Sequence, residues 1–85
     1  MTVRIFTKND CMPCKMTKRM FDKAGVEYQE INMEHNPSER EKVVKAGLSS
    51  APVIEVDGEF VASGFKPETV QNIITIIEHP FEKTA

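Results

Sequence analysis

The chain has 85 residues, of which 40% are hydrophobic and 28% charged, and its formal net charge is −2. This length predicts one domain, and the composition is that of an ordinary folded globule rather than a disordered chain. No apolar run approaches the roughly 18 residues of a membrane span, and the acidic balance argues against a general nucleic-acid binder.

The first half of the chain carries alternating strand and helix signals. We expect a strand at 3–6, a helix from Met12 to Ala24 that ends at Gly25, and a second strand at 26–33. Asn36 followed by Pro37 predicts the start of a second helix, which runs to about Ala46. Six side chains are expected to point inward from the two helices: Met12, Met16, Met20, Phe21, Val43 and Val44.

The second half predicts a hairpin followed by a helix. Strands at 52–56 and 59–62 flank Asp57-Gly58, a strong signal for a two-residue turn. Pro67 opens the last helix, and Pro80 ends it. Its apolar stripe is Val70, Ile73, Ile74 and Ile77. We expect residues 1–79 to form the domain and residues 80–85 to form a loose tail.

The element order is therefore β-α-β-α-β-β-α, which predicts a four-stranded mixed α/β sheet with helices on both faces. The first β-α-β unit should pair its strands in parallel. Cys11 then lies in the turn after the first strand, and Cys14 lies in the first turn of the first helix. This is the carboxyl edge of the sheet, where such folds bind their ligands.

Cys11 and Cys14 are the only two cysteines. The N-terminus shows no secretory signal, so we expect a cytoplasmic protein, in which a close pair is redox-active or metal-binding rather than a static disulfide. At this spacing two helical Cα atoms lie roughly 5–6 Å apart, within reach of a disulfide. The helix N-terminus, with Lys8 and Lys15 nearby, should favour a Cys11 thiolate, which makes Cys11 the nucleophile and Cys14 the resolving thiol.

Charge is distributed unevenly along the chain. Residues 1–25 carry six cations and two acids, net +4, whereas residues 26–85 carry five cations and eleven acids, net −6. A solvated helix face is the simplest interpretation of the cations.

Two alternatives to redox chemistry remain open. A lone C-x-x-C offers two metal ligands where a structural zinc needs four, and His35 and His79 have no ligand spacing. A Cu(I)-binding module would also place such a pair between a first strand and a first helix. The other alternative is a pair of buried thiols without a redox role, but C-x-x-C in a βαβ context with Pro52 before the third strand favours redox chemistry. The three helix methionines are interpreted as core, with an exposed Met12 that contacts a partner as the alternative.

C-M-P-C (11–14), Ala51-Pro52-Val53 and Ser63-Gly64-Phe65-Lys66-Pro67 together closely resemble the NrdH-redoxin family, over residues 3 to about 77. These are glutaredoxin-like proteins of the thioredoxin fold. The resemblance implies a cis-proline at Pro52 that faces the cysteine pair. It also implies a contact surface for protein partners made of Met12, Pro13, Ala51, Pro52, Ser63, Gly64, Phe65 and Lys66. Ala62 departs from the family, which usually has an aromatic residue there.

The resemblance further implies a redox carrier with protein-disulfide reductase activity, which donates electrons to the large subunit of class Ib ribonucleotide reductase. We expect this carrier to be a monomer and to need no metal or other cofactor. Thioredoxin reductase would recharge it, and neither nucleic acid nor membrane would be a partner. A glutathione-dependent glutaredoxin is the alternative within the same chemistry.

Overall fold

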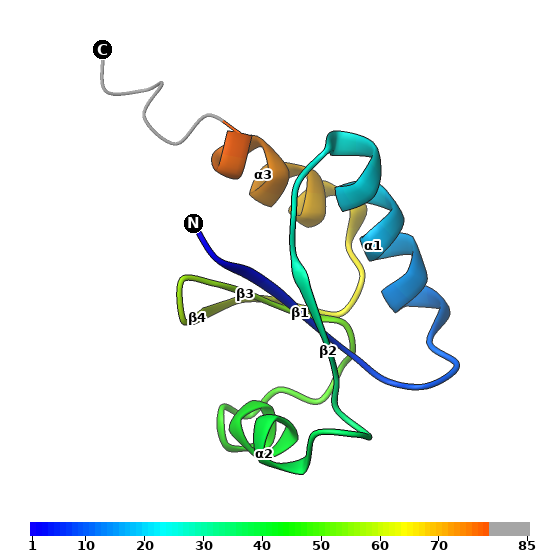
Figure 1. Ribbon diagram of the computed structural model, residues 1–85, viewed down its shortest axis with the longest axis vertical. Coiled ribbons are helices and arrows are strands. Elements are labelled where there is room, and N and C mark those ends of the chain that lie inside the picture. Colours follow the sequence, from blue (N-terminus) through cyan, green and yellow to red (C-terminus); the bar gives the residue numbers. More distant parts are fainter. Residues whose placement is uncertain (79–85) are drawn as a thin grey trace.

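The computed structural model describes residues 1–78 and confirms the predicted order of elements (Figure 1). The elements are β1 (Val3–Thr7), α1 (Met12–Ala24), β2 (Gln29–Asn32), α2 (Pro37–Lys45), β3 (Val53–Val56), β4 (Glu59–Ser63) and α3 (Pro67–Glu78). The predicted helix end at Pro80, His79 and the predicted tail at 80–85 lie outside the described residues, so the domain boundary stays a prediction.

The four strands form one mixed sheet in the order β2-β1-β3-β4. β1 and β2 run parallel, and β3 is antiparallel to both β1 and β4. α1 and α3 pack together on one face of the sheet, and α2 lies on the other (Figure 1). This is the expected three-helix arrangement of the thioredoxin fold.

The alternation of side chains along β1 and β3 divides the interior into two clusters. Val3, Ile5 and Ile54 face α1 and α3, where Phe21 and the α3 stripe complete the larger cluster. Phe6 and Val53 face α2, where Val43 completes the smaller one. Successive side chains of a strand point to opposite faces of the sheet. Helices therefore cover both faces of these central strands, α1 and α3 on one and α2 on the other.

Two glycines act where the sequence predicts them to. Gly25 adopts a left-handed conformation with φ 72° at the end of α1, and its N–H donates to the Asp22 carbonyl. Asp57 and Gly58 have φ 51° and 87° between β3 and β4. Positive φ at both central residues is what a type I′ hairpin turn requires.

The predicted inward face of α1 is wrong for two of its methionines. Met12 is 64% exposed and Met16 37% exposed, whereas Cys14, Thr17 and Phe21 are buried and Met20 is only partly buried. Residues 14, 17 and 21 share one helical face. Phe21 packs into the larger cluster with residues of β1, β3 and α3, so this packing sets the buried face of α1.

Two further expectations, on α2 and on β2, need correction. Val44 is 56% exposed, because α2 presents only one buried residue, Val43, to the sheet. β2 is also shorter than predicted: its pairing with β1 begins at Gln29 opposite Arg4. Val26 and Tyr28 pack against the larger cluster from the loop that precedes β2.

Candidate functional site

Four strand ends meet at one edge of the sheet and bring the predicted site residues together. Thr7 pairs with Asn32, so β1 and β2 end side by side. Val53, at the start of β3, pairs with Phe6 on one side and with Ser63 on the other. The loops that hold the cysteines, Pro52 and Gly64 therefore lie at the same edge.

Cys11 and Cys14 form a disulfide whose Cα atoms lie 5.2 Å apart, as the spacing predicts. Cys11 occupies the N-cap of α1 in an extended conformation, and Pro13 lies within the first turn. The Cys14 backbone N–H donates to Cys11 Sγ over 3.1 Å. Both residues are buried, with 4% of Cys11 and 2% of Cys14 exposed. A donor at a helix N-terminus stabilises an anion, so this contact would favour a thiolate on Cys11 after reduction.

The loop before β3 lies beside the end of β4 and is bonded to it. The Ala51–Pro52 peptide bond is cis, as the family resemblance implies, and Pro52 is fully buried. The Gly64 N–H donates to the Pro52 carbonyl over 2.7 Å and to the Ser50 carbonyl over 3.2 Å. The Ser63 hydroxyl donates to the same Ser50 carbonyl over 2.9 Å. These bonds run to the residues on either side of Ala51 and hold its backbone between them.

The remainder of the Ser63–Pro67 loop divides between core and solvent. Gly64 has φ 83°, a conformation that side chains rarely adopt. Phe65 and Ala62 are partly buried and pack against the larger cluster, whereas Lys66 is exposed. The expected apolar contact of Phe65 with a partner is therefore limited to the part of the ring that the core leaves uncovered.

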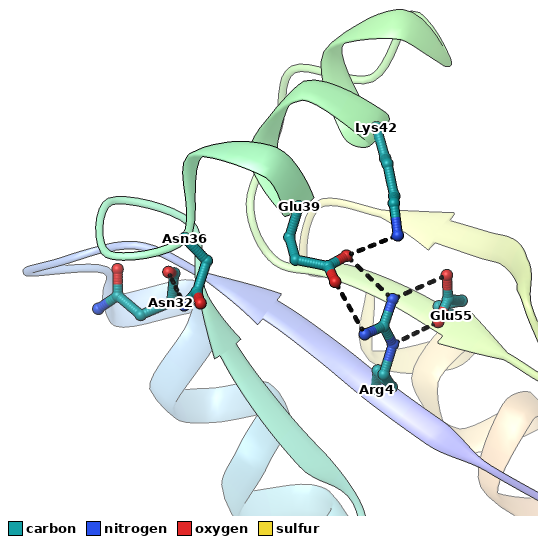
Figure 2. Close-up of polar contacts among 6 residues, drawn as sticks. All are labelled: Arg4, Asn32, Asn36, Glu39, Lys42 and Glu55. Atoms are coloured by element: carbon teal, nitrogen blue, oxygen red, sulfur yellow. Dashed lines mark hydrogen bonds and ion pairs between the residues drawn. The ribbon is translucent and has the colours of Figure 1, made fainter.

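The chain segment just before Cys11 is held by a polar network that the sequence did not reveal. Glu34 accepts from the Asn9 backbone N–H over 2.8 Å and from the Asn9 amide over 3.2 Å. Asn32 donates to Asn9 Oδ1 over 2.9 Å. Asn36 is the N-cap residue of α2, and its side chain donates to the Asn32 carbonyl over 2.8 Å rather than capping the helix (Figure 2). The sequence signal that could have predicted this network is the group of Asn and Glu residues that follows the first two strands.

The cations near the cysteines have different environments. Lys18 Nζ forms an ion pair with Glu30 Oε1 at 3.1 Å, and the buried Thr7 hydroxyl donates to the same carboxylate over 2.8 Å. Burial would raise the pKa of Glu30, but the bonds from Thr7 and Lys18 outweigh it and lower that pKa. Lys8 and Lys15 are exposed on either side of Cys11, and their influence on the thiol stays a prediction.

Within residues 1–78, no three His, Cys, Asp or Glu side chains gather closely enough to hold a metal ion. His35 is exposed, as a surface histidine would be. Over the same residues, every helix is too short or too polar to cross a membrane.

Comparison with known proteins bears directly on this arrangement. Residues 3–61 match the glutaredoxin family. The chain is 38% identical over 71 residues to the glutaredoxin-like protein NrdH of Lactococcus lactis subsp. cremoris (strain MG1363), across 84% of this chain and 97% of that one. It is 32% identical over 73 residues to the NrdH protein of Escherichia coli (strain K12), across 86% and 89%.

A solved structure agrees with these matches. NrdH-redoxin from Escherichia coli, described as a glutaredoxin-like protein with a thioredoxin-like activity profile, superimposes with a TM-score of 0.78 at 30% identity. The superposition covers 86% of this chain and 95% of that one.

Proposed function

This chain belongs to the glutaredoxin family, among its NrdH redox proteins, and on that premise we propose that it is a cytoplasmic dithiol electron donor to class Ib ribonucleotide reductase that thioredoxin reductase recharges. The observation that carries the proposal is the Cys11–Cys14 disulfide at the N-terminus of α1, on the sheet edge that also holds cis-Pro52. The thioredoxin-like activity profile of the Escherichia coli relative supports thioredoxin reductase over glutathione as the source of electrons.

In the proposed reaction the two cysteines have different roles. The Cys11 thiolate attacks one sulfur of a partner disulfide, so a Cys11–partner bond forms and the other partner sulfur leaves as a thiolate. Cys14 then loses its proton and attacks Cys11 Sγ, which breaks the mixed disulfide and releases the second partner thiolate. Two electrons have moved to the partner, and the Cys11–Cys14 bond has formed. Thioredoxin reductase then reduces the Cys11–Cys14 disulfide back to two thiols, with electrons from NADPH.

The partner is expected to approach at Met12 and Ala51. The Met12 side chain is exposed directly after Cys11, and Ala51 presents a backbone segment next to Pro52. An extended partner segment could pair with that backbone while its disulfide meets Cys11. Pro13, Ser63, Gly64 and Lys66 complete the proposed contact surface.

Glutathione is expected to be a poor reductant because it carries charges that need fixed polar partners. The Ser63–Pro67 loop beside the cysteines offers few such partners, because Phe65 packs against the core and Pro67 has no N–H. Lys66 is the exposed cation that could hold a carboxylate there.

NADPH consumption with insulin as the disulfide substrate tests the source of electrons. One arm contains thioredoxin reductase, and the other contains glutathione with glutathione reductase. We expect fast turnover in the first arm and slow turnover in the second. Efficient turnover with glutathione and none with thioredoxin reductase would make this protein a glutathione-dependent glutaredoxin.

Covalent capture tests the recipient. Without Cys14 the mixed disulfide cannot be resolved, so Cys14→Ser should trap the oxidised large subunit of class Ib ribonucleotide reductase under non-reducing conditions. Cys11→Ser is the matched control and should trap nothing. If the oxidised subunit is present and neither variant captures it, this recipient is wrong.

A further inference from the structure

One face of α1 is exposed, cationic and partly apolar. Five exposed residues on this face form what we call the α1 stripe: Met12, Lys15, Met16, Arg19 and Lys23. Met12, Met16, Arg19 and Lys23 follow one another at spacings of four, three and four residues, and Lys15 lies three residues after Met12 and four before Arg19. Side chains at this spacing lie on one face of a helix. Met12 and Met16 are 64% and 37% exposed, so the stripe carries two uncovered thioether side chains among three cations.

The charge of the stripe is not balanced by its own helix. The remaining cation of α1, Lys18, pairs with Glu30, and Asp22 accepts from the Tyr28 hydroxyl over 3.0 Å. Among the ion pairs formed within residues 1–78, none includes Lys15, Arg19 or Lys23. The rest of the chain, residues 26–85, carries a net charge of −6. Positive charge is therefore concentrated in the first 25 residues, and three of their six cations lie on the stripe.

The stripe begins beside the reactive disulfide and leads away from it. Met12 follows Cys11 directly, and Lys23 lies 11 residues further, about 17 Å along the helix axis at 1.5 Å per residue. α3 and the sheet lie on one side of α1, and no other described element covers the opposite side (Figure 1). A surface of this length suits a folded partner better than a small molecule.

We propose that the α1 stripe is the surface by which the recharging reductase recognises the oxidised protein, and that the reductase presents an acidic, partly apolar surface to it. This inference rests on the proposed function. The stripe begins at Met12, directly after one of the two cysteines of the disulfide that the reductase must reduce, and its two methionines are exposed. Complementary charge speeds encounter and fixes the orientation of docking, and the methionines supply adaptable apolar contact.

Neutralisation of the far end of the stripe tests the inference without altering the cysteines. Arg19→Gln/Lys23→Gln removes two charges from α1, and Lys42→Gln/Lys45→Gln removes two from α2, on the other face of the sheet. Thioredoxin reductase with NADPH is the probe, and kcat/KM for each protein is measured from low salt to about 0.5 M. Reduction by dithiothreitol, which needs no docking surface, reports whether the disulfide is undisturbed.

We expect the α1 pair to lower kcat/KM about three- to tenfold at low salt, the α2 pair to change it much less, and the difference to close at high salt. Equal effects of the two pairs, or a loss confined to electron delivery to ribonucleotide reductase, would overturn the inference. So would self-association of the wild type that the α1 pair abolishes, since a second copy would then occupy the stripe. If dithiothreitol reduces the α1 pair abnormally, Lys23→Gln alone, furthest from the disulfide, decides by the same salt series.

Failure of the proposed function has a different signature. In that case the wild type itself is not reduced by thioredoxin reductase at any salt concentration, and the inference falls with it.

Discussion

At the scale of single residues, the position of Cys11 at the start of α1 accounts for the chemistry of the site. Both cysteines are almost fully buried, but the Cys11 sulfur accepts the Cys14 backbone N–H at the N-terminus of α1, whereas Cys14 lies inside the first turn. A helix N-terminus favours negative charge. The two thiols are one turn apart and yet have different electrostatic environments.

This difference predicts that Cys11 ionises at a lower pH than Cys14 in the reduced protein. Brief alkylation near neutral pH, followed by peptide mapping, should label Cys11 several times faster, because the thiolate is the reactive form. The nearly equal exposure of the two residues makes access a weak competing explanation. Preferential labelling of Cys14 would reverse the assigned roles.

Tyr28 offers a second residue-scale test, because it is the only tyrosine and the chain has no tryptophan. Burial, with the hydrogen bond to Asp22 as the next cause, raises the pKa of Tyr28 to about 12. The neutral phenol is favoured in the folded state, so its contribution to stability is complete below about pH 10 and is lost as pH rises through about 12.

Phenolate absorbance near 295 nm should therefore show one transition near pH 12, and Asp22→Asn should move it toward 10. Circular dichroism recorded at each pH establishes that the chain is still folded. A transition near 10 in folded wild type would contradict the prediction.

At the scale of elements, α2 is the helix with the fewest buried residues, and an ionic contact supplements its one buried residue. Arg4 on β1 bonds Glu55 on β3 at 2.6 Å and Glu39 on α2 at 3.1 Å (Figure 2). The same guanidinium lies 5.0 Å from the centre of the Phe6 ring. The hydrogen bond from Arg4 is the main cause that lowers the pKa of Glu39, so the contact is complete at neutral pH and is lost as pH falls below the ordinary range of a glutamate.

Glu39→Gln should therefore loosen α2 selectively. We expect amide exchange in α2 to become about two- to fivefold faster, the range for a solvent-accessible ion pair, with α1 unchanged. Glu41→Gln is the matched control, since Glu41 pairs with Lys45 at 3.1 Å on the exposed side of the same helix. Equal acceleration by both variants would mean that helix charge, rather than the bond to Arg4, holds α2.

At the scale of the whole molecule, the sheet separates a large cluster under α1 and α3 from a small one under α2. Phe21 lies in the large cluster and is fully buried, and Val43 is the single buried residue of α2. The element that carries the cysteines therefore packs on the more extensive core, which holds the redox pair in place.

Core truncation should reflect this asymmetry. Phe21→Ala is expected to cost about 3–5 kcal/mol of unfolding free energy, and Val43→Ala about 1.5–3 kcal/mol for two buried methyl groups and the space they leave. Urea denaturation of the oxidised proteins measures both. Phe21→Leu provides a milder substitution if the alanine variant does not fold. A larger loss at Val43 than at Phe21 would show that the smaller cluster dominates stability.

The local signals of the sequence determined the order of the elements and the place of the cysteines. Helix starts and stops such as Pro37, Gly25 and Pro67, and the Asp57-Gly58 turn, act through a few neighbouring residues, so they can be interpreted without the fold. The 5.2 Å spacing of the cysteine Cα atoms is local in the same way.

Only the tertiary structure decided which side of α1 is buried and which charges pair. Met12 and Met16 fit an inward stripe as well as Cys14 and Thr17 do, until the sheet fixes the helix rotation. Arg4 meets Glu39 and Glu55 across 35 and 51 residues of sequence. No periodicity encodes such pairs, because their energy depends on geometry and solvent exclusion that exist only once the strands have assembled.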